Sequence, residues 1–298
     1  MMAGTQRQSL LQRIGFWLAL GLVFFFFMFP LYWITVSSIK TRAEVISRVP
    51  TYIPFVQFEP TLENYASVLI GGSIQSETGV RASADLSAFR DRLINSIIIA
   101  GTSTLLAVGL GTLTAYAVSR FRIPAENDVM FFILSTRMLP PVVVLIPIFL
   151  LFSDLKLNNS YPGIILLYTT FNLPFVVWMM KGFFDEIPVE YEEAAMIDGY
   201  SRLEAIWKIV IPEAIPAMAA TAVFSAIVAW NEFVLANLLN RDYAATVPPW
   251  LNSIIGVGAV EWGRLAAASV VFVIPIVVFT FLVRNHLLRG VTFGAVRR

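Results

Sequence analysis

The 298-residue chain contains no cysteine and a single histidine, His286. The absence of cysteine excludes disulfides, thiolate metal sites and cysteine nucleophiles. One imidazole leaves little basis for a histidine metal cluster or for histidine acid–base catalysis. The sequence also has no Gly-x-x-x-x-Gly-Lys-Ser/Thr segment, the usual cradle for the phosphates of ATP. We therefore predict no catalytic residue, no metal site and no cofactor in this chain.

Charged residues are scarce as well. They make up 14% of the chain, whereas 57% of its residues are hydrophobic and the mean hydropathy is +0.74. Soluble domains carry about 25% charged residues, so this composition indicates a protein embedded in membrane lipid. The net charge of +1 provides no basic surface for nucleic acid, and we predict no nucleic-acid partner.

Apolar runs long enough to cross a ~30 Å hydrocarbon core recur along the chain. The first, 14–37, is longer and bulkier than the ~7–15-residue apolar region of a signal peptide. Five more runs lie within residues 93–284, and Pro140 and Pro141 interrupt the second of these five. The sequence thus predicts an all-α integral membrane protein with six transmembrane helices. The five later runs lie near residues 93–118, 129–152, 162–180, 212–235 and 265–283.

The second predicted span contains three glycines that suit close packing of helices in lipid. These glycines are Gly101, Gly109 and Gly111.

The polar segments indicate which side of the membrane each loop occupies. Residues 38–92 form the only long polar stretch, and we expect a periplasmic or extracellular loop in which 71–91 is an insertion with a short helix. Lys and Arg gather in residues 1–13, in the short turn at 119–122 and in the tail 285–298. Short loops rich in these residues stay on the cytoplasmic side, so both termini are predicted to be cytoplasmic.

A polar stretch at about 185–212 separates the fourth and fifth predicted spans. Pro188 and the acidic residues after it favour the start of a short helix, and Gly199 suits a left-handed C-terminal cap. Ser201 and Glu204 have the spacing of a capping box that begins a second helix. The stretch therefore predicts a helix–turn–helix with the character of a docking element. An apolar stripe is expected on its second helix at Leu203, Ile206, Trp207 and Val210.

This stretch resembles the EAA loop of ABC importer membrane subunits. That pattern reads E-A-A, three residues, G, nine residues, then I-x-L-P, and here Ile211 replaces the leucine. In that family the loop faces the cytoplasm and its short helix inserts into a cleft on the ATP-hydrolysing subunit. The resemblance implies that Glu193 pairs with an Arg or Lys of the ATPase and that Gly199 permits the turn. The ATPase-coupling residues that it implies are Glu193, Ala194, Ala195, Met196, Asp198 and Gly199.

Other segments are similar to the second membrane subunit of maltose-type carbohydrate importers. They are the TLENY run at 61–65, the WNEF run at 230–233, the Y-A-x-S-R run at 116–120 and the ending R-G-V-T-F-G-A-V at 289–296. The resemblance implies a type I ABC importer permease fold with a cytoplasmic EAA coupling helix. In the maltose system this tail reaches between the ATPase subunits, which implies tail contacts at Gly290, Thr292 and Gly294.

The resemblance also implies the function and the partners. The chain would be the permease subunit of a binding-protein-dependent importer in the bacterial cytoplasmic (inner) membrane, forming half of the pathway for a carbohydrate or polyol-type solute. Its partners would be a second homologous permease, a dimer of ATPase subunits that hold ATP and Mg²⁺, and an extracytoplasmic solute-binding protein. Two alternatives stay open: the same role with glycerol, glycerol phosphate or a sulfonated sugar derivative, and an ion-driven secondary transporter.

Four polar residues in or near the spans are candidates for the translocation pathway. A charge at the centre of a membrane helix costs ~2.5–3.5 kcal/mol, so Arg137 is expected to face protein or water. It would contact the pathway or the partner subunit, or be a structural residue bonded to free carbonyl groups near Pro140 and Pro141. Residues 231 and 232, near the outer third of the fifth span, could meet substrate, pair with a partner or lie at the interface. The candidates are Arg137, Asn172, Asn231 and Glu232.

Overall fold

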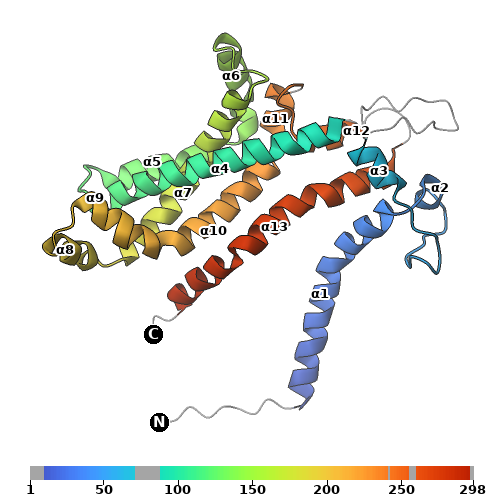
Figure 1. Cartoon of the computed structure of the whole chain (residues 1–298), viewed down its shortest axis with the longest axis horizontal. Coiled ribbons are helices and arrows are strands. Elements are labelled where there is room, and N and C mark those ends of the chain that lie inside the picture. Colours follow the sequence, from blue (N-terminus) through green and yellow to red (C-terminus); the bar gives the residue numbers. More distant parts are fainter. Residues whose placement is uncertain (1–9, 71–87, 241, 255–259, 296–298) are drawn as a thin grey trace. The chain divides into compact units, whose positions relative to one another are not determined.

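The predicted all-α architecture is confirmed. The computed structural model describes residues 10–70, 88–240, 242–254 and 260–295, and no β-strand occurs in these ranges. Residues 71–87, which make up most of the predicted insertion, lie outside the described part, as do residues 1–9 and 296–298. Figure 1 shows the helices along the chain.

Within the described residues, five helices are long and apolar enough to cross a membrane. A sixth candidate is a pair of helices, α5 (Glu126–Met138) and α6 (Pro141–Asp154), which meet at 90°. Counting that pair as one span gives the six that we predicted. Four of the other five candidates lie within α1 (Leu10–Ser38), α4 (Phe89–Arg120), α7 (Tyr161–Glu186) and α13 (Trp262–Ala295). The fifth runs from Arg202 to Trp230 and ends in α10 (Ile211–Trp230).

The break in the third span is at Pro140 and Pro141. Proline lacks a backbone N–H and pushes the residue before it out of the helical region. Accordingly Leu139 (ψ 120°) and Pro140 (ψ 130°) are extended, and α6 starts at Pro141, where the missing N–H is not needed. The sequence located this break, but it gave no indication of its right angle.

One predicted span end is wrong, and another falls within a longer helix. The fifth span was expected to reach about residue 235, but α10 ends at Trp230 and a separate short helix, α11 (Val234–Leu239), follows. The sixth span was expected to end near 283, and the candidate membrane span ends at Asn285, while the helix α13 itself continues to Ala295. Much of the predicted tail 285–298 is thus the last part of a long helix.

The chain divides into two compact units. One contains residues 1–87 and 254–271, and the other contains residues 88–253 and 272–298. We call them unit 1 and unit 2 and describe each by itself.

In unit 1 the TLENY run fastens the chain where it leaves α1. Asn64, on α3 (Glu63–Leu69), donates its side-chain amide to the carbonyl groups of Ser38 (2.9 Å) and Lys40 (2.8 Å). The Tyr65 hydroxyl lies 2.7 Å from the hydroxyl of Ser38. A Thr41–Glu44 capping box then starts α2 (Arg42–Val45). These bonds give the run a structural role that the sequence did not reveal.

Lys40 is a buried anchor of the same region. Its ammonium lies 4.9 Å from the ring centre of Trp33 and 5.0 Å from that of Phe58, and it donates to the carbonyl of Thr51. Burial lowers the pKa of the Lys40 amino group, and the negative charge of Glu44 opposes that shift. Two aromatic faces and one carbonyl replace part of the water that the charge has lost.

Gly263, at the start of α13, leaves no space for a larger residue in unit 1. A Cβ there would lie 2.7 Å from Nδ2 and 2.9 Å from Oδ1 of Asn64, and the two carbonyl bonds prevent that amide from moving aside. We expect Gly263→Ala to destabilise the unit by about 1–3 kcal/mol. Faster amide exchange at residues 38–41 would show it. Gly101→Ala is the control, since no atom lies within 4 Å of its added Cβ. Equal exchange in the two variants would contradict the prediction.

Unit 2 is built around α4, α7 and α10, which pack against one another (Figure 1). Where α4 and α7 cross, Gly111 faces Val176, and a Cβ on the glycine would lie 2.6 Å from a Val176 methyl. Gly101 and Gly109, predicted to pack in the same way, have no neighbouring atom within 4 Å of an added Cβ. Of the three glycines, Gly111 is therefore the one that allows α4 and α7 to pack at a short distance. The core around this crossing includes Ala107, Val108, Ala115, Tyr116, Met180, Phe184, Val210 and Ala214.

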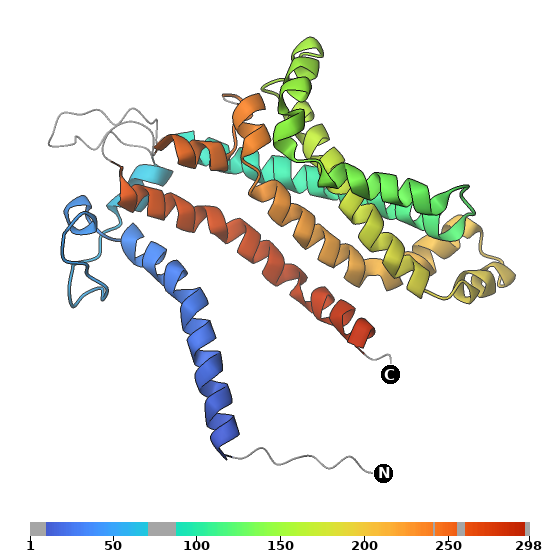
Figure 2. The ribbon, with the colours of Figure 1, turned by 180° about the vertical axis from the view of Figure 1, so that it is seen from behind.

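Buried polar side chains of α4 hold the connection between α11 and α12 (Val247–Ile254). Asn95 donates its amide to the carbonyl groups of Tyr243 (3.0 Å) and Ala245 (2.9 Å). Ser96 accepts a hydrogen bond from the N–H of Val247 at 3.0 Å. Seen from behind, this connection and the helices α8 and α9 lie at opposite ends of unit 2 (Figure 2).

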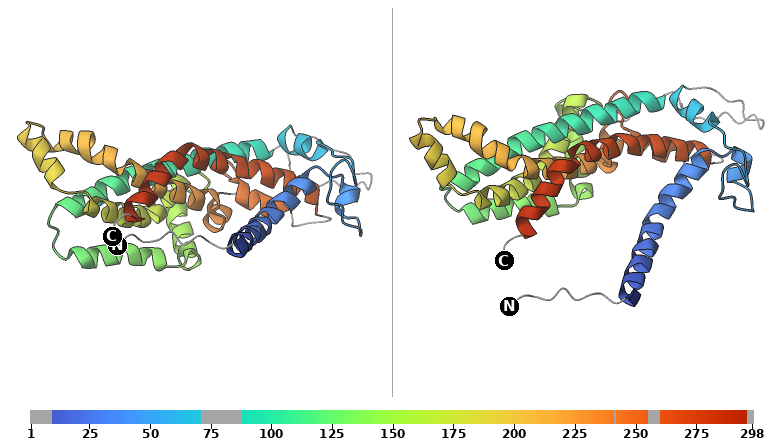
Figure 3. Two further views of the ribbon diagram at one scale, coloured as in Figure 1. Left: turned by 90° about the horizontal axis from the view of Figure 1, so that it is seen from below. Right: turned by 60° about the horizontal axis from the view of Figure 1, so that its bottom comes forward.

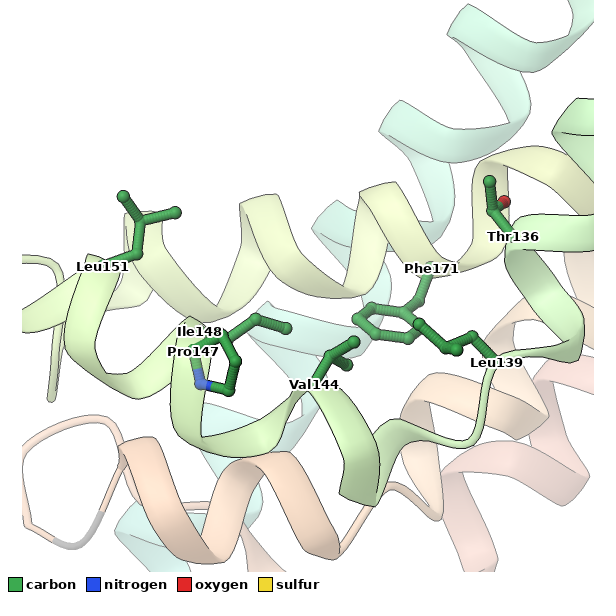
Figure 4. A pocket seen from close by; sticks show the side chains of 7 residues that line it. All are labelled: Thr136, Leu139, Val144, Pro147, Ile148, Leu151 and Phe171. Atoms are coloured by element: carbon green, nitrogen blue, oxygen red, sulfur yellow. The ribbon is translucent and has the colours of Figure 1, made fainter.

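Helix α6 leaves the α4–α7–α10 bundle, and all but one of its described residues are at least partly exposed (Figure 1). Between it, the end of α5 and α7 is a hollow of about 280 Å³. Its wall is apolar apart from one hydroxyl, and in Figure 4 the Phe171 ring of α7 lies opposite the α6 side chains. The lining residues are Thr136, Leu139, Val144, Pro147, Ile148, Leu151 and Phe171.

Candidate functional site

The predicted short helix in the EAA stretch is present as α8 (Glu190–Ile197). It ends as predicted, because Gly199 has φ +94° and is in the left-handed region. The N–H of Tyr200 donates to the carbonyl of Ala195 (3.1 Å) and the N–H of Gly199 to that of Met196 (3.1 Å). These two bonds form a Schellman motif, which satisfies the terminal carbonyl groups and turns the chain back.

The second helix begins as predicted, but it does not continue as predicted. The Ser201–Glu204 capping box is formed, and α9 (Arg202–Ala205) follows. A π-helical turn at Ile206–Val210 then joins α9 directly to α10. The N–H of Ile211 donates to the carbonyl five residues back, at Ile206, and Pro212 has no N–H to donate. The wider turn breaks the helical period on which the predicted stripe rested.

The stripe itself is therefore wrong. Val210 is buried and Ile206 is half-buried, whereas Leu203 is 65% and Trp207 57% exposed. Two of the four apolar residues face away from this chain.

The residues implied as ATPase contacts fall into two groups. Glu193, Ala194, Asp198 and Gly199 are exposed, whereas Met196 is half-buried and Ala195 is buried. Among the described residues, no hydrogen-bonding or ionic partner is found for the side chain of Glu193. The outer face of α8 also carries Ile197, which is 86% exposed.

The side chain that fastens α8 to unit 2 is Glu192, a residue that the sequence marked only as favourable near a helix start. Its Oε1 lies 2.5 Å from Nε of Arg120, and its Oε2 accepts the hydroxyl of Tyr116 at 2.5 Å. Both side chains of the ion pair are 5% exposed. Tyr116 and Arg120 are four residues apart on α4 and so share one face of that helix. This spacing within the Y-A-x-S-R run was the one available signal.

The guanidinium of Arg120 also caps α7. It donates to the carbonyl groups of Phe184 (3.0 Å) and Ile187 (3.0 Å), at the end of α7, and to the hydroxyl of Ser119 (3.0 Å). A cation is favourable at a helix C-terminus, where carbonyl groups lack helical partners. One side chain thus joins the ends of α4 and α7 to α8, and we call the Tyr116–Arg120–Glu192 group the clamp. Figure 3 shows α8 and α9 together at this end of unit 2 from two directions.

A more exposed set of ion pairs borders the clamp. Lys181 of α7 lies 2.9 Å from Glu126 of α5 and 2.7 Å from Asp185, whose other oxygen accepts the hydroxyl of Ser119 at 2.6 Å. Since Ser119 also contacts Arg120, these bonds continue from α5 through α7 to the clamp.

Two of the pathway candidates lie together. Arg137, at the end of α5, donates to the carbonyl of Phe171 and lies 3.5 Å from Oδ1 of the buried Asn172, both on α7. The carbonyl group that it binds therefore lies on α7. It is not one of the free carbonyl groups near Pro140 and Pro141 that the structural alternative expected.

The other two candidates lie beyond α10 rather than within the fifth span. Both carboxylate oxygens of Glu232 accept N–H groups of the first turn of α11, at Leu235 (2.9 Å) and Ala236 (3.0 Å). One of them also accepts the hydroxyl of Tyr168 at 3.0 Å. Asn231 is exposed and donates to the carbonyl of Ile227 at 2.8 Å. Glu232 thus caps a helix, and the structure brings neither residue into contact with Arg137.

The predicted tail contacts lie on regular helix. Gly290, Thr292 and Gly294 are all within the last turns of α13.

Known proteins with a similar sequence and a known structure with a similar fold are all components of transport systems. The family model described as "Binding-protein-dependent transport system inner membrane component" matches residues 107–292. The trehalose/maltose transport system permease protein MalG of Thermococcus litoralis is 33% identical over 98% of this chain and 99% of its own length. The sulfoquinovosyl glycerol transport system permease protein SmoH of Agrobacterium fabrum is 31% identical over 91% of this chain and 89% of its own.

A solved structure agrees in fold. The crystal structure of a bacterial ABC transporter involved in the import of the acidic polysaccharide alginate contains a chain that matches with a TM-score of 0.73. The match covers 96% of this chain and 100% of that one, at 23% sequence identity.

Proposed function

Since the chain belongs to the family of binding-protein-dependent transport system inner membrane components, we propose that it forms half of the import pathway for a carbohydrate or polyol-type solute, with α8 as the helix that couples it to an ATPase. The chain is a multi-pass membrane permease of the ABC importer type and a transport component rather than an enzyme. Because the chain belongs to this family, we no longer keep the alternative of an ion-driven secondary transporter.

The substrate class rests on the relatives. Their names specify trehalose or maltose, sulfoquinovosyl glycerol, and diacetylchitobiose, all of which contain sugar units. Neutral and sulfonated compounds both occur among these names, so an anionic sugar derivative belongs to the proposed class. Arg137 and Asn172, joined at the bend of the third span, are the pathway residues we favour for polar contact with it. Asn231 and Glu232 are proposed to border the pathway beyond α10.

The outer face of α8 is the observation that carries the coupling proposal. It combines the exposed Glu193, whose carboxylate has no partner in the part of the chain that the structure describes, and an exposed Asp198 with the strongly exposed Ile197. A lipid-facing helix would not carry the two acids, because charges in hydrocarbon are costly. If this region faced only water, the apolar side chains nearby, at Leu203 and Trp207, would be exposed to solvent, which is unfavourable. A mixed surface of this kind fits a protein partner, which we propose is the ATPase.

The proposed function implies the other subunits of the assembly and its orientation in the membrane. The partners are a second homologous permease, two ATPase subunits that bind ATP and Mg²⁺, and an extracytoplasmic solute-binding protein. Helix α8 and both termini face the cytoplasm of a cell whose inner membrane holds the complex, with Gly290, Thr292 and Gly294 near the ATPase. The loop between α1 and α4 is then on the outer side.

Glu193→Lys and Gly199→Pro test the coupling role. The first reverses the exposed charge of α8, and the second removes the N–H and the positive φ that close the helix. We expect the co-purified complex to lose its ATPase subunit, or its binding-protein-stimulated hydrolysis to fall about tenfold or more, as for the loss of a charged interface contact. Glu63→Lys, an exposed charge reversal on α3, is the control and should change neither. ATPase retention and stimulation equal to wild type in both test variants would refute the coupling role.

A further inference from the structure

The side-chain bonds of α8 all lead to α4 and its neighbour α7. Glu192 bonds Arg120 and Tyr116 of α4, and Arg120 bonds the carbonyl groups that end α7. On α9, the guanidinium of Arg202 lies 5.2 Å from the ring centre of Phe121, directly after α4. Among the described residues, no hydrogen bond or ion pair joins a side chain of α8 to α10. Helices α8 and α9 are thus attached by side chains to α4 and α7, which precede them in the sequence.

The covalent link from α8 and α9 to α10 is a segment of irregular helix. It consists of the π-helical turn at Ile206–Val210, followed by Pro212 and Pro216, which donate no backbone hydrogen bonds. Such turns and prolines are the usual places where helices bend. The chain thus continues into α10 through irregular helix that is held by apolar packing of Val210 and Ala214, whereas the clamp holds α8 by short, buried and directional polar bonds.

We propose that the clamp makes α8 a rigid extension of α4 and α7, so that a displacement of α8 is delivered to these two helices while the π-helical turn absorbs the difference from α10. Arg120 and Glu192 are positioning residues in this scheme. The inference rests on the proposed function, because the ATPase is what moves α8.

The geometry of the clamp suits a rigid link. A guanidinium presents its donors in one plane, so bonds from Nε, Nη1 and Nη2 to separate acceptors fix orientation as well as distance. Pulling α8 away would break the buried ion pair and leave the Arg120 guanidinium with neutral acceptors alone, which is unfavourable. Because α7 also carries Asn172 and the carbonyl that holds Arg137, movement of α7 reaches the favoured pathway residues directly.

Distances between spin labels can test the link. The chain has no cysteine, so nitroxide labels can be attached at introduced Cys residues without further changes. Glu190→Cys on α8 is combined either with Leu113→Cys on α4 or with Ile227→Cys on α10, all at exposed positions. Electron–electron double resonance on the assembled complex in lipid discs, with and without MgATP, gives the two distances. We expect the 190–113 distance to stay the same on nucleotide binding. A 190–113 distance that changes while 190–227 stays constant would show that α8 moves with α10 and would overturn the proposal.

Variants of the clamp provide the second part of the test. In Glu192→Gln, which removes the ion pair, the 190–113 distance is expected to shift and broaden when MgATP is added. Tyr116→Phe, which removes one hydrogen bond and keeps the ring packed on Phe184, should show a smaller effect in the same direction and guards against a folding defect in the first variant. Glu186→Gln, the same substitution at an exposed site at the end of α7, should behave as wild type. Nucleotide-independent 190–113 distances in both clamp variants would overturn the inference.

The result stays separable from the coupling proposal. In Glu192→Gln the outer face of α8 is unchanged, so the ATPase subunit should still co-purify and hydrolyse ATP. Failure of the proposed function would appear in the Glu193→Lys and Gly199→Pro complexes, whose outer face or turn is altered. Failure of the inference would appear only in the label distances.

Discussion

Gly111→Leu is expected to abolish the folded bundle. A Cβ at this position would lie 2.6 Å from Cγ1 and 2.8 Å from Cβ of Val176, and 3.5 Å from the backbone N of Val177. Both valines are completely buried, so neither can turn away. Overpacking a core costs about 1–3 kcal/mol for extra methylenes, and a whole leucine side chain forced between two helix backbones exceeds that range. We expect no folded monomer in a detergent-solubilised, size-exclusion assay.

The same helix offers a control and a rescue. Gly109→Leu adds the same side chain to an exposed position that has no atom within 4 Å, and it should fold like wild type. Gly111→Ala with Val176→Ala moves the volume from one side of the contact to the other and should recover most of the stability. If Gly111→Leu folds as well as Gly109→Leu, the α4–α7 crossing is not where we place it.

Arg120→Met has the second largest expected effect, on stability. It leaves the carboxylate of Glu192 buried with one hydroxyl as its partner, and it removes the donors to the carbonyl groups of Phe184 and Ile187. Removing one partner of a buried ion pair typically costs 3–5 kcal/mol. Thermal unfolding of the purified protein should show a correspondingly large decrease in Tm.

Arg122→Met is the matched control, because Arg122 is exposed two residues further on. Arg120→Met combined with Glu192→Met should recover a large part of the lost stability, since it removes the unpaired charge together with its partner. An Arg120→Met variant whose Tm matches that of Arg122→Met would mean that the clamp contributes nothing to folding.

Features encoded by neighbouring residues were predicted well from the sequence. The left-handed cap at Gly199 and the capping box at Ser201 and Glu204 depend on a few adjacent residues, and both are present. The membrane spans were found because each needs only one long apolar run. The family resemblance rested on similarly local patterns.

Features that depend on distant contacts were missed. Glu192 and Arg120 are 72 residues apart, and the spacing of Tyr116 and Arg120 on one helix face does not identify Glu192 as their partner. Likewise Gly101, Gly109 and Gly111 look equivalent in the sequence, and only the crossing of α4 with α7 distinguishes them. The failed stripe has a different cause: a fixed period of 3.6 residues was applied across a turn that is π-helical.

The right-angled break in the third span bears on how the protein enters the membrane. At 1.5 Å per residue, the 13 residues of α5 and the 14 residues of α6 each extend for about 20 Å, which is short of the ~30 Å hydrocarbon core. Neither helix is long enough to cross the core alone, whereas the two together are. The ribosome delivers α5 and α6 before α7, and Arg137 has no α7 carbonyl to bind until then. The contact that joins the end of α5 to α7 can therefore form only after α7 has been synthesised, whereas the break itself is set by Pro140 and Pro141.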